Sequence, residues 1–72
     1  MVARMDFKLK TEFIELDNLL KVLNFVASGA DAKQYIQSNS IKVNGQGEAR
    51  IRRKLRAGDF IEFGQQQISI VA

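Results

Sequence analysis

The spacing of the apolar residues changes from helical to alternating near the middle of the chain, so the fold must combine helices with strands. Four leucines between residues 16 and 23 recur at i, i+3, i+4 and i+7, which predicts an amphipathic helix over about residues 15–23. Farther along, apolar and polar residues alternate around Ile41 and Val43 and again over residues 67–71, as in half-buried strands. This order predicts an α+β fold in which two short helices pack on a small, largely antiparallel sheet.

A short strand is also expected near the start of the chain. Apolar and charged side chains alternate over residues 7–13, with Phe7 and Leu9 on the expected core side. We assign residues 1–6 to a flexible N-terminus and residues 7–72 to a single domain, because no linker, repeat or low-complexity stretch divides the chain. With 72 residues, the chain is close to the lower size limit for a self-sufficient hydrophobic core.

Ser28 marks the expected start of the second helix. Its hydroxyl can accept a hydrogen bond from a free amide of the first turn, and Asp31 fits a loose capping box and complements the helix dipole. The helix should end near Ser38. Asn39 follows it where a left-handed backbone angle is common, and Asn24 holds the same place after the first helix. The free amides at the start of the second helix could instead bind a phosphate, so both explanations of Ser28 stay open.

Three glycine-containing pairs predict the turns of the sheet. Asn44-Gly45 is typical of a primed hairpin turn. Gly58-Asp59 should form a turn between the basic residues 50–56 and a strand over residues 60–63. Gly64-Gln65 should join residues 60–63 to residues 67–71 as a further hairpin.

The positive charge of the chain is concentrated in one short segment. The chain has 11 Lys and Arg and 8 Asp and Glu, so its formal net charge is +3. Residues 50–56, which we name the basic segment, hold five of these cations and no acid, whereas the rest of the chain is neutral to acidic. Such a concentration indicates a site for a polyanion, because charge that only aids solubility would be spread evenly.

Read as an extended strand, the basic segment has one cationic face with side chains about 6.6 Å apart. Ile51 and Leu55 point to the core, and Arg53 breaks the alternation. The cationic face consists of Arg50, Arg52, Lys54 and Arg56. A bound phosphate backbone would relieve their mutual repulsion, and Arg suits both bidentate phosphate contacts and stacking on bases. The alternative is a solvated edge strand whose charges prevent edge-to-edge aggregation.

The residue types that the chain lacks limit its chemistry. It has no Cys for a thiolate or a disulfide, and no His, the commonest metal ligand. No motif pairs two carboxylates and the chain is too short to enclose a large pocket, so we expect no catalytic activity, no metal and no cofactor. No apolar run approaches the roughly 18 residues of a membrane span, and the start of the chain lacks a signal-peptide core. We therefore expect a cytoplasmic protein with no membrane partner.

Four motifs in a fixed order resemble a known RNA-binding domain. They are Leu16-Asp17 with Leu20-Lys21, Ser28-Gly29-Ala30-Asp31-Ala32-Lys33, Ile41-Lys42-Val43-Asn44-Gly45, and Gly58-Asp59-Phe60-Ile61. In this order and spacing they resemble the RNA-binding domain of ribosomal protein S-four, also called the alpha-L motif. The serine-glycine-alanine start of the second helix and the Arg-rich run resemble its small stand-alone bacterial members, the YbcJ type. The resemblance covers about residues 13–71.

The resemblance implies binding to structured RNA, such as ribosomal RNA, through one surface formed by the two helices and the following hairpin. Carried over to this chain, it gives the site residues Ser28, Gly29, Lys33, Lys42, Asn44, Arg50, Arg52, Arg53, Lys54 and Arg56. Glu15 and Gly29 stand where many members carry a cation, which removes charge from the helical half of the surface. RNA is thus the expected partner of a monomeric protein, and a ribosomal or RNA-processing protein is a second candidate partner.

Other classes of function are weaker. An adaptor in a ribosome-assembly or RNA-processing complex would use the same basic segment against an acidic protein. The chain is also similar to ubiquitin-like sulfur carriers, but those end in Gly-Gly and this sequence ends Ile70-Val71-Ala72. A membrane-surface anchor would need a helical apolar face beside the cations, which the basic segment lacks. Tyr35 could be a stacking platform, although a partly buried helix position explains it more simply.

Overall fold

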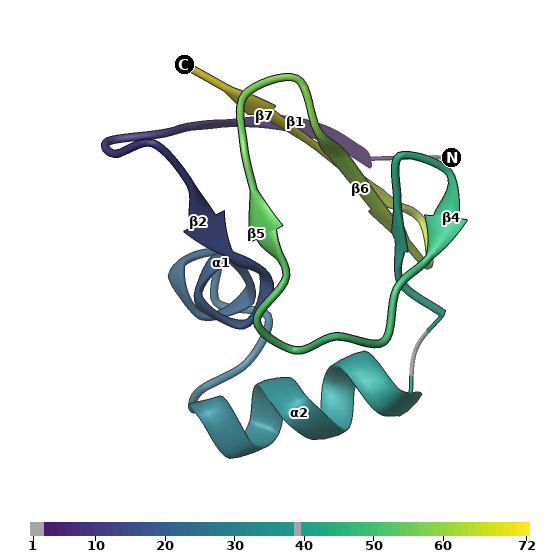
Figure 1. Ribbon diagram of the computed structural model, residues 1–72. Coiled ribbons are helices and arrows are strands. Elements are labelled where there is room, and N and C mark those ends of the chain that lie inside the picture. The colour runs from purple at the N-terminus through teal and green to yellow at the C-terminus, as the bar shows by residue number, and fades with distance from the viewer. Residues whose placement is uncertain (1–2, 39) are drawn as a thin grey trace.

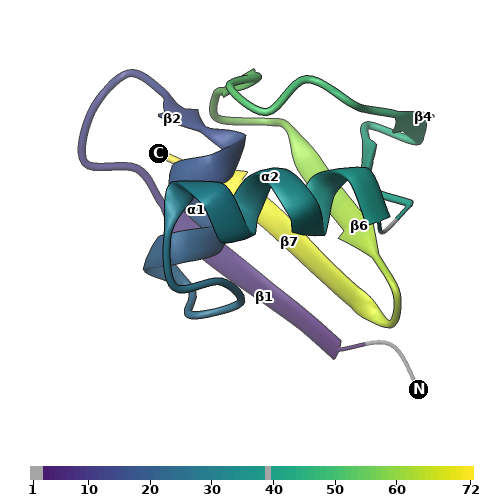
Figure 2. The same cartoon turned by 90° about the horizontal axis from the view of Figure 1, so that it is seen from below.

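Both helices lie on the same side of a five-stranded sheet (Figures 1 and 2). The computed structural model describes residues 3–38 and 40–72. Its elements are β1 (Ala3–Lys8), β2 (Ile14–Glu15), α1 (Leu16–Val22), α2 (Gly29–Ser38), β3 (Lys42–Val43), β4 (Gln46–Gly47), β5 (Lys54–Leu55), β6 (Phe60–Phe63) and β7 (Gln66–Val71). Within the described ranges, no helix is long and apolar enough to cross a membrane.

The main sheet has the strand order β1-β7-β6-β3-β4. Strand β1 runs parallel to β7, and the other neighbours are antiparallel. Strands β2 and β5 form a separate antiparallel pair, in which Ile14 lies opposite Leu55 and Glu15 opposite Lys54. The predicted α+β fold with a largely antiparallel sheet is therefore confirmed.

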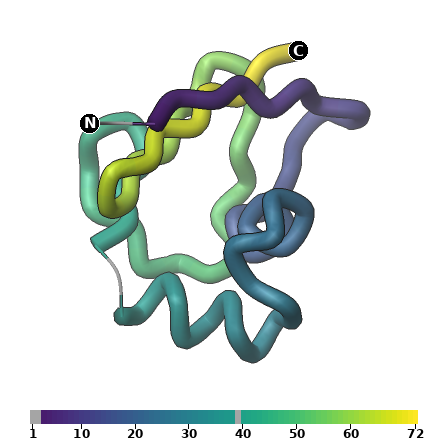
Figure 3. The backbone as a smooth tube through the Cα atoms, turned by 180° about the vertical axis from the view of Figure 1, so that it is seen from behind, coloured from purple at the N-terminus to yellow at the C-terminus, as the bar shows by residue number. Residues whose placement is uncertain are grey.

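Strand β1 lies earlier in the chain than the alternation of apolar residues predicts. It pairs with β7 along its whole length (Figure 3). The pairing ends where β7 ends, with the Leu9 amide donating to the Val71 carbonyl at 2.8 Å. The predicted strand over residues 7–13 is thus wrong in its bounds, and residues 3–6 belong to the sheet instead of to a flexible N-terminus. Their side chains are all exposed, although apolar and charged residues alternate over residues 3–8, so pairing with β7 and not burial defines this part of the edge strand.

Both predicted helices are confirmed. Asn24, just after α1, adopts a positive φ of 63°, the left-handed angle expected for it. At the start of α2, the Asp31 amide donates to Ser28 Oγ at 3.2 Å, so Ser28 is a helix cap. Asn39 lies outside the described residues.

The predicted turns are also present. Asn44 and Gly45 have φ angles of 55° and 83°, as a primed hairpin turn between β3 and β4 requires. Gly58 has a φ of 97° in the turn before β6. A third turn at Gly64 and Gln65 joins β6 to β7.

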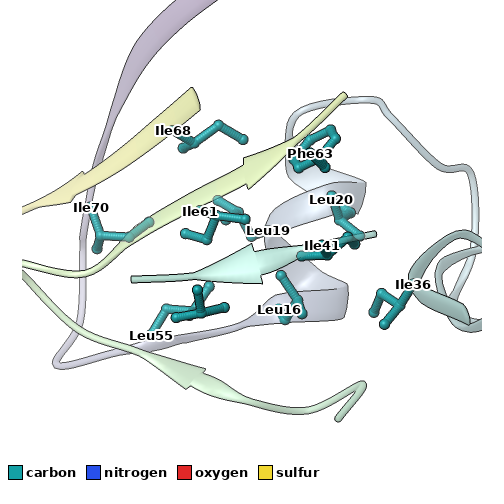
Figure 4. Packing of buried hydrophobic residues seen from close by; sticks show 11 residues of the cluster. Leu16, Leu19, Leu20, Ile36, Ile41, Leu55, Ile61, Phe63, Ile68 and Ile70 are labelled. Carbon is teal, nitrogen blue, oxygen red and sulfur yellow. The ribbon is translucent and has the colours of Figure 1, made fainter. Parts of the chain in front are cut away.

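The core lies between the helices and the sheet (Figure 4). Both helices and strands β3, β5, β6 and β7 each contribute at least one buried apolar side chain. The cluster shown consists of Leu16, Leu19, Leu20, Ile36, Ile41, Leu55, Ile61, Phe63, Ile68 and Ile70, with Val43 beside them. Leu55 belongs to the basic segment and is fully buried, so the core anchors this segment from beneath.

Candidate nucleic-acid interface

The basic segment is extended over only part of its length. Ile51 and Arg52 form a turn, and only Lys54 and Leu55 belong to a strand. The predicted straight row of evenly spaced cations is therefore wrong. The orientation of the apolar side chains is as predicted, since Leu55 is buried and Ile51 packs against the core.

The bend in the basic segment follows from its contact with α1. The Arg53 carbonyl accepts a hydrogen bond from the Leu16 amide at 2.9 Å, and the Ile51 carbonyl accepts one from the Asp17 amide at 3.0 Å. The first amides of a helix have no partner within the helix, so acceptors from elsewhere in the chain stabilise its start. A segment that turns to supply two such carbonyls is no longer a regular strand.

The bend nevertheless gathers all the cations of the segment at one place. A surface hollow of about 330 Å³ is lined by Arg50, Arg52, Arg53, Lys54 and Arg56, and we name it the cationic hollow. None of the lining residues is acidic. Clustered guanidinium and ammonium groups with water access form a natural binding site for phosphate groups.

Glu48 holds one end of the cationic hollow in place. Its carboxylate accepts hydrogen bonds from the backbone amide, Nε and Nη2 of Arg50, each at 3.0 Å, and from Nη1 of Arg53 at 2.6 Å. The Glu48 side chain is only 8% exposed. The hydrogen bonds from Arg50, opposed by burial and aided by Arg53, lower the pKa of Glu48 to about 2. One of the five positive charges is therefore compensated, and the positions of two guanidinium groups are fixed.

The sequence alone does not predict the contacts of Glu48. The position of Glu48 two residues before Arg50 is the one feature of the sequence that indicates their ion pair. The side-chain contact with Arg53 depends on the bend of the backbone. Replacing Glu48 with Gln is expected to lower the free energy of unfolding by about 1–2 kcal/mol at neutral pH, because the guanidinium groups lose a charged acceptor.

The difference in free energy of unfolding between wild type and Glu48→Gln should depend on pH in one direction. The folded-state pKa of Glu48, about 2, lies below its ordinary value of 4.5, so its contribution is present above pH 4.5 and is lost as the pH falls towards 2. Urea unfolding of wild type and Glu48→Gln across this range should show the two stabilities converging in acid. A stability difference that stays constant from neutral pH to pH 2 would contradict the role assigned to the carboxylate.

Phe13 is a second residue of the site that the sequence reasoning did not assign. Its ring centroid lies 4.9 Å from Lys54 Nζ and 5.8 Å from Arg56 Cζ. Phe13 directly precedes β2, and its approach to the cations results from the pairing of β2 with β5, a contact between segments about 40 residues apart. The sequence alone carries no signal for this pairing.

One side of α2 borders the basic segment. A hollow of about 570 Å³ at the end of α2 is lined by residues that include Gln37, Lys42 and Ala49. Lys33 and Gly29 stand one and two turns before Gln37, so they share this side of the helix. In Figures 1 and 2, α2 runs beside the stretch that leads into β5. Of the predicted site residues of α2 and β3, Lys42 lines this hollow, together with Glu48 and Ala49, which directly precede the basic segment.

Besides Arg50 and Arg53, two uncharged residues of the predicted site, Ser28 and Asn44, use their side chains within the fold. Ser28 caps α2, as described above. Asn44 donates from Nδ2 to Asp59 Oδ1 and accepts at Oδ1 from the Phe60 amide, both at 3.0 Å. Asp59 Oδ2 in turn accepts from the Arg56 amide at 2.8 Å. Asn44 thus links the β3–β4 turn to the end of the basic segment.

The same hydrogen bonds change the pKa of Asp59. Burial alone would raise the pKa of Asp59, but the hydrogen bonds from the Arg56 amide and the Asn44 side chain lower it below its ordinary value. The carboxylate therefore stays charged and holds the backbone at the end of the cationic hollow.

Acidic side chains form no metal site in the described part of the chain. No group of three or more Asp, Glu, His or Cys residues there could hold a metal ion. Glu15 lies opposite Lys54 in the β2–β5 pair, which places one carboxyl group near the edge of the site. The chemistry available at the site is thus that of cations beside an aromatic ring.

The chain is similar to known proteins along most of its length. The model of a family described as "S4 domain" matches residues 7–71. Over 63 residues the chain is 38% identical to "Putative RNA-binding protein YbcJ" of Escherichia coli (strain K12), which covers 88% of this chain and 90% of that protein. Over 61 residues it is 36% identical to "Probable ribosome maturation protein RlbA" of Bacillus subtilis (strain 168), covering 81% of this chain and 86% of that protein.

Proposed function

The chain belongs to the S4 domain family, and from this premise we propose that it is a non-catalytic RNA-binding protein. The binding surface is the cationic hollow together with the adjoining side of α2, and the ligand is a structured RNA, with ribosomal RNA a candidate. The observation that carries the proposal is the gathering of five Lys and Arg side chains around one hollow that no acid lines. The printed names of the relatives, one RNA-binding and one for ribosome maturation, support it.

The fixed geometry of the site supports phosphate binding. Arg50 and Arg53 are held by Glu48, so less side-chain entropy is lost when they meet a ligand. The other three cations of the hollow are exposed, and no ion pair with an acid is found for them in residues 3–38 and 40–72. Exposed cations can each neutralise one phosphate of an RNA backbone.

The side of α2 supports recognition of RNA shape. Lys33 on α2 and Lys42 on β3 are exposed cations outside the lining of the cationic hollow. Double-stranded RNA is recognised mainly through the geometry of its phosphates and 2′-hydroxyl groups. Cations on two elements at fixed separation suit such recognition better than a single flexible basic tail does.

The proposal is tested by ultraviolet crosslinking in cells and sequencing of the RNA bound to the wild type. The comparison is a variant with Arg52→Glu and Arg56→Glu, which we name the hollow variant. The matched control carries Arg4→Glu and Lys21→Glu, which change the net charge equally on exposed positions of β1 and α1.

We expect specific RNA from wild type and from the matched control, and little from the hollow variant. Equal recovery from all three proteins would refute the assigned surface. Recovery of a protein partner but no RNA after nuclease treatment would favour the adaptor instead.

A further inference from the structure

We infer that Phe13 and the apolar surface beside it form a nucleobase-binding subsite, in which one unpaired base of a bound RNA stacks while a neighbouring phosphate lies on Lys54 and Arg56. The inference rests on the proposed function and adds the class of RNA element that the site takes. It predicts that the protein prefers a strand with an accessible base at this point over a continuous duplex.

The pairing of β2 with β5 explains why an aromatic ring lies among these cations. In this antiparallel pair Ile14 is opposite Leu55, so Phe13 comes opposite Arg56. Lys54 lies two residues from Arg56 and shares its face of the pair. Ile14 and Leu55 point the other way, into the core. The half-buried ring, the two exposed cations and Glu15, which is opposite Lys54, therefore share one face of an anchored pair of strands.

Phe13 also lines an apolar hollow. This hollow has a volume of about 330 Å³, and its apolar lining consists of Phe7, Leu9, Phe13, Ile14 and Val22. Two lysines and a threonine complete the lining. Val22 is 59% exposed, an unusual degree for a large apolar residue at the edge of a core. Phe13 thus stands between the cationic hollow and an open apolar surface.

A nucleotide has the matching arrangement of chemistry. Its phosphate is an anion, and its base is a flat aromatic group with polar edges. Proteins that bind single strands commonly combine a cationic groove for the backbone with aromatic rings on which bases stack. Lysines at the rim of the apolar hollow can meet the polar edges of the base or further phosphates.

A purely structural role of Phe13 makes a different prediction. If the ring only holds Lys54 and Arg56 in place by cation–π contact, its loss weakens every RNA alike, because the phosphate contacts suffer. If a base stacks on the ring, its loss weakens only RNAs that carry a base. The two roles are separated by a ligand that has the same phosphates but no bases.

The experiment measures the affinity of an oligoadenylate and of an abasic ribose-phosphate oligomer of equal length, at one salt concentration. One stacked base contributes about 1–3 kcal/mol, so wild type should bind the oligoadenylate about 5- to 150-fold more tightly. Phe13→Leu should lose this preference while keeping its affinity for the abasic oligomer. Phe13→Trp should retain the preference. Phe25→Leu is the matched control, because Phe25 packs edge to face on Phe63 at 5.1 Å, away from both hollows.

Each remaining outcome overturns a specific claim. Equal affinity of wild type for the two oligomers would overturn the base subsite and leave phosphate binding by the cationic hollow intact. Equal weakening of both oligomers by Phe13→Leu would overturn it in favour of the structural role. If wild type bound neither of the two oligomers and also failed to bind a labelled RNA stem-loop, the proposed function would be refuted, and the subsite with it.

Discussion

Replacing Arg52 and Arg56 with Glu is expected to weaken binding of a labelled RNA stem-loop by more than about 100-fold at low salt. Each substitution removes a charge-assisted hydrogen bond to a phosphate and adds a negative charge to the cationic hollow. Neither side chain is buried, so the domain should remain folded. The affinity is measured by fluorescence anisotropy, with circular dichroism as the check on folding.

The matched control separates a local site from a general effect of charge. Arg4→Glu together with Lys21→Glu changes the net charge as much as the hollow variant does, but the substituted positions lie on β1 and α1. We expect less than about a 10-fold loss for this protein, from long-range electrostatics alone. Equal losses in both variants would mean that net charge, and not the cationic hollow, determines the affinity.

Replacing Leu55 with Ala is expected to lower the free energy of unfolding by about 2–5 kcal/mol. Leu55 is fully buried and belongs to β5, so the substitution leaves a cavity beneath the basic segment. A domain of 72 residues has a total stability of about 4–11 kcal/mol, and the loss is therefore a large part of it. Urea unfolding followed by circular dichroism measures the change.

Val22→Ala is the control for Leu55→Ala. Val22 is 59% exposed, so its truncation should change the free energy of unfolding by less than about 1 kcal/mol. If Leu55→Ala were as mild as Val22→Ala, the core would not anchor the basic segment, and the geometry of the cationic hollow would need another explanation.

The sequence predicts those parts of the fold whose stability comes from local patterns. The leucine stripe of α1 has the helical period, and three of its members are fully buried in the structure. Asn44-Gly45 forms the predicted turn because both residues tolerate positive φ. The alternation of apolar and charged residues in β1 begins at Ala3, but its first residues are exposed, so hydrogen bonds to β7, and not burial, define the strand there.

In the candidate site, too, local sequence patterns predict some features and long-range contacts determine the others. The charge count locates the basic segment, and the alternation within it predicts that Leu55 is buried. The bend at Ile51 was not predictable, because its cause is the need of distant α1 amides for acceptors. Glu48 and Phe13 join the site through contacts that only the folded chain creates. Composition thus identifies the cations, while long-range pairing determines their geometry.

The salt dependence of RNA affinity tests the central claim, that phosphates bind in the cationic hollow, most directly. If about three to five cations each neutralise a phosphate, the logarithm of the affinity should fall with the logarithm of the salt concentration with a slope of about −2 to −4. For the hollow variant, the slope should be shallower by about 1.4 to 1.8, because two phosphate contacts are lost. A wild-type slope near zero, or the same slope for wild type and the hollow variant, would contradict the account.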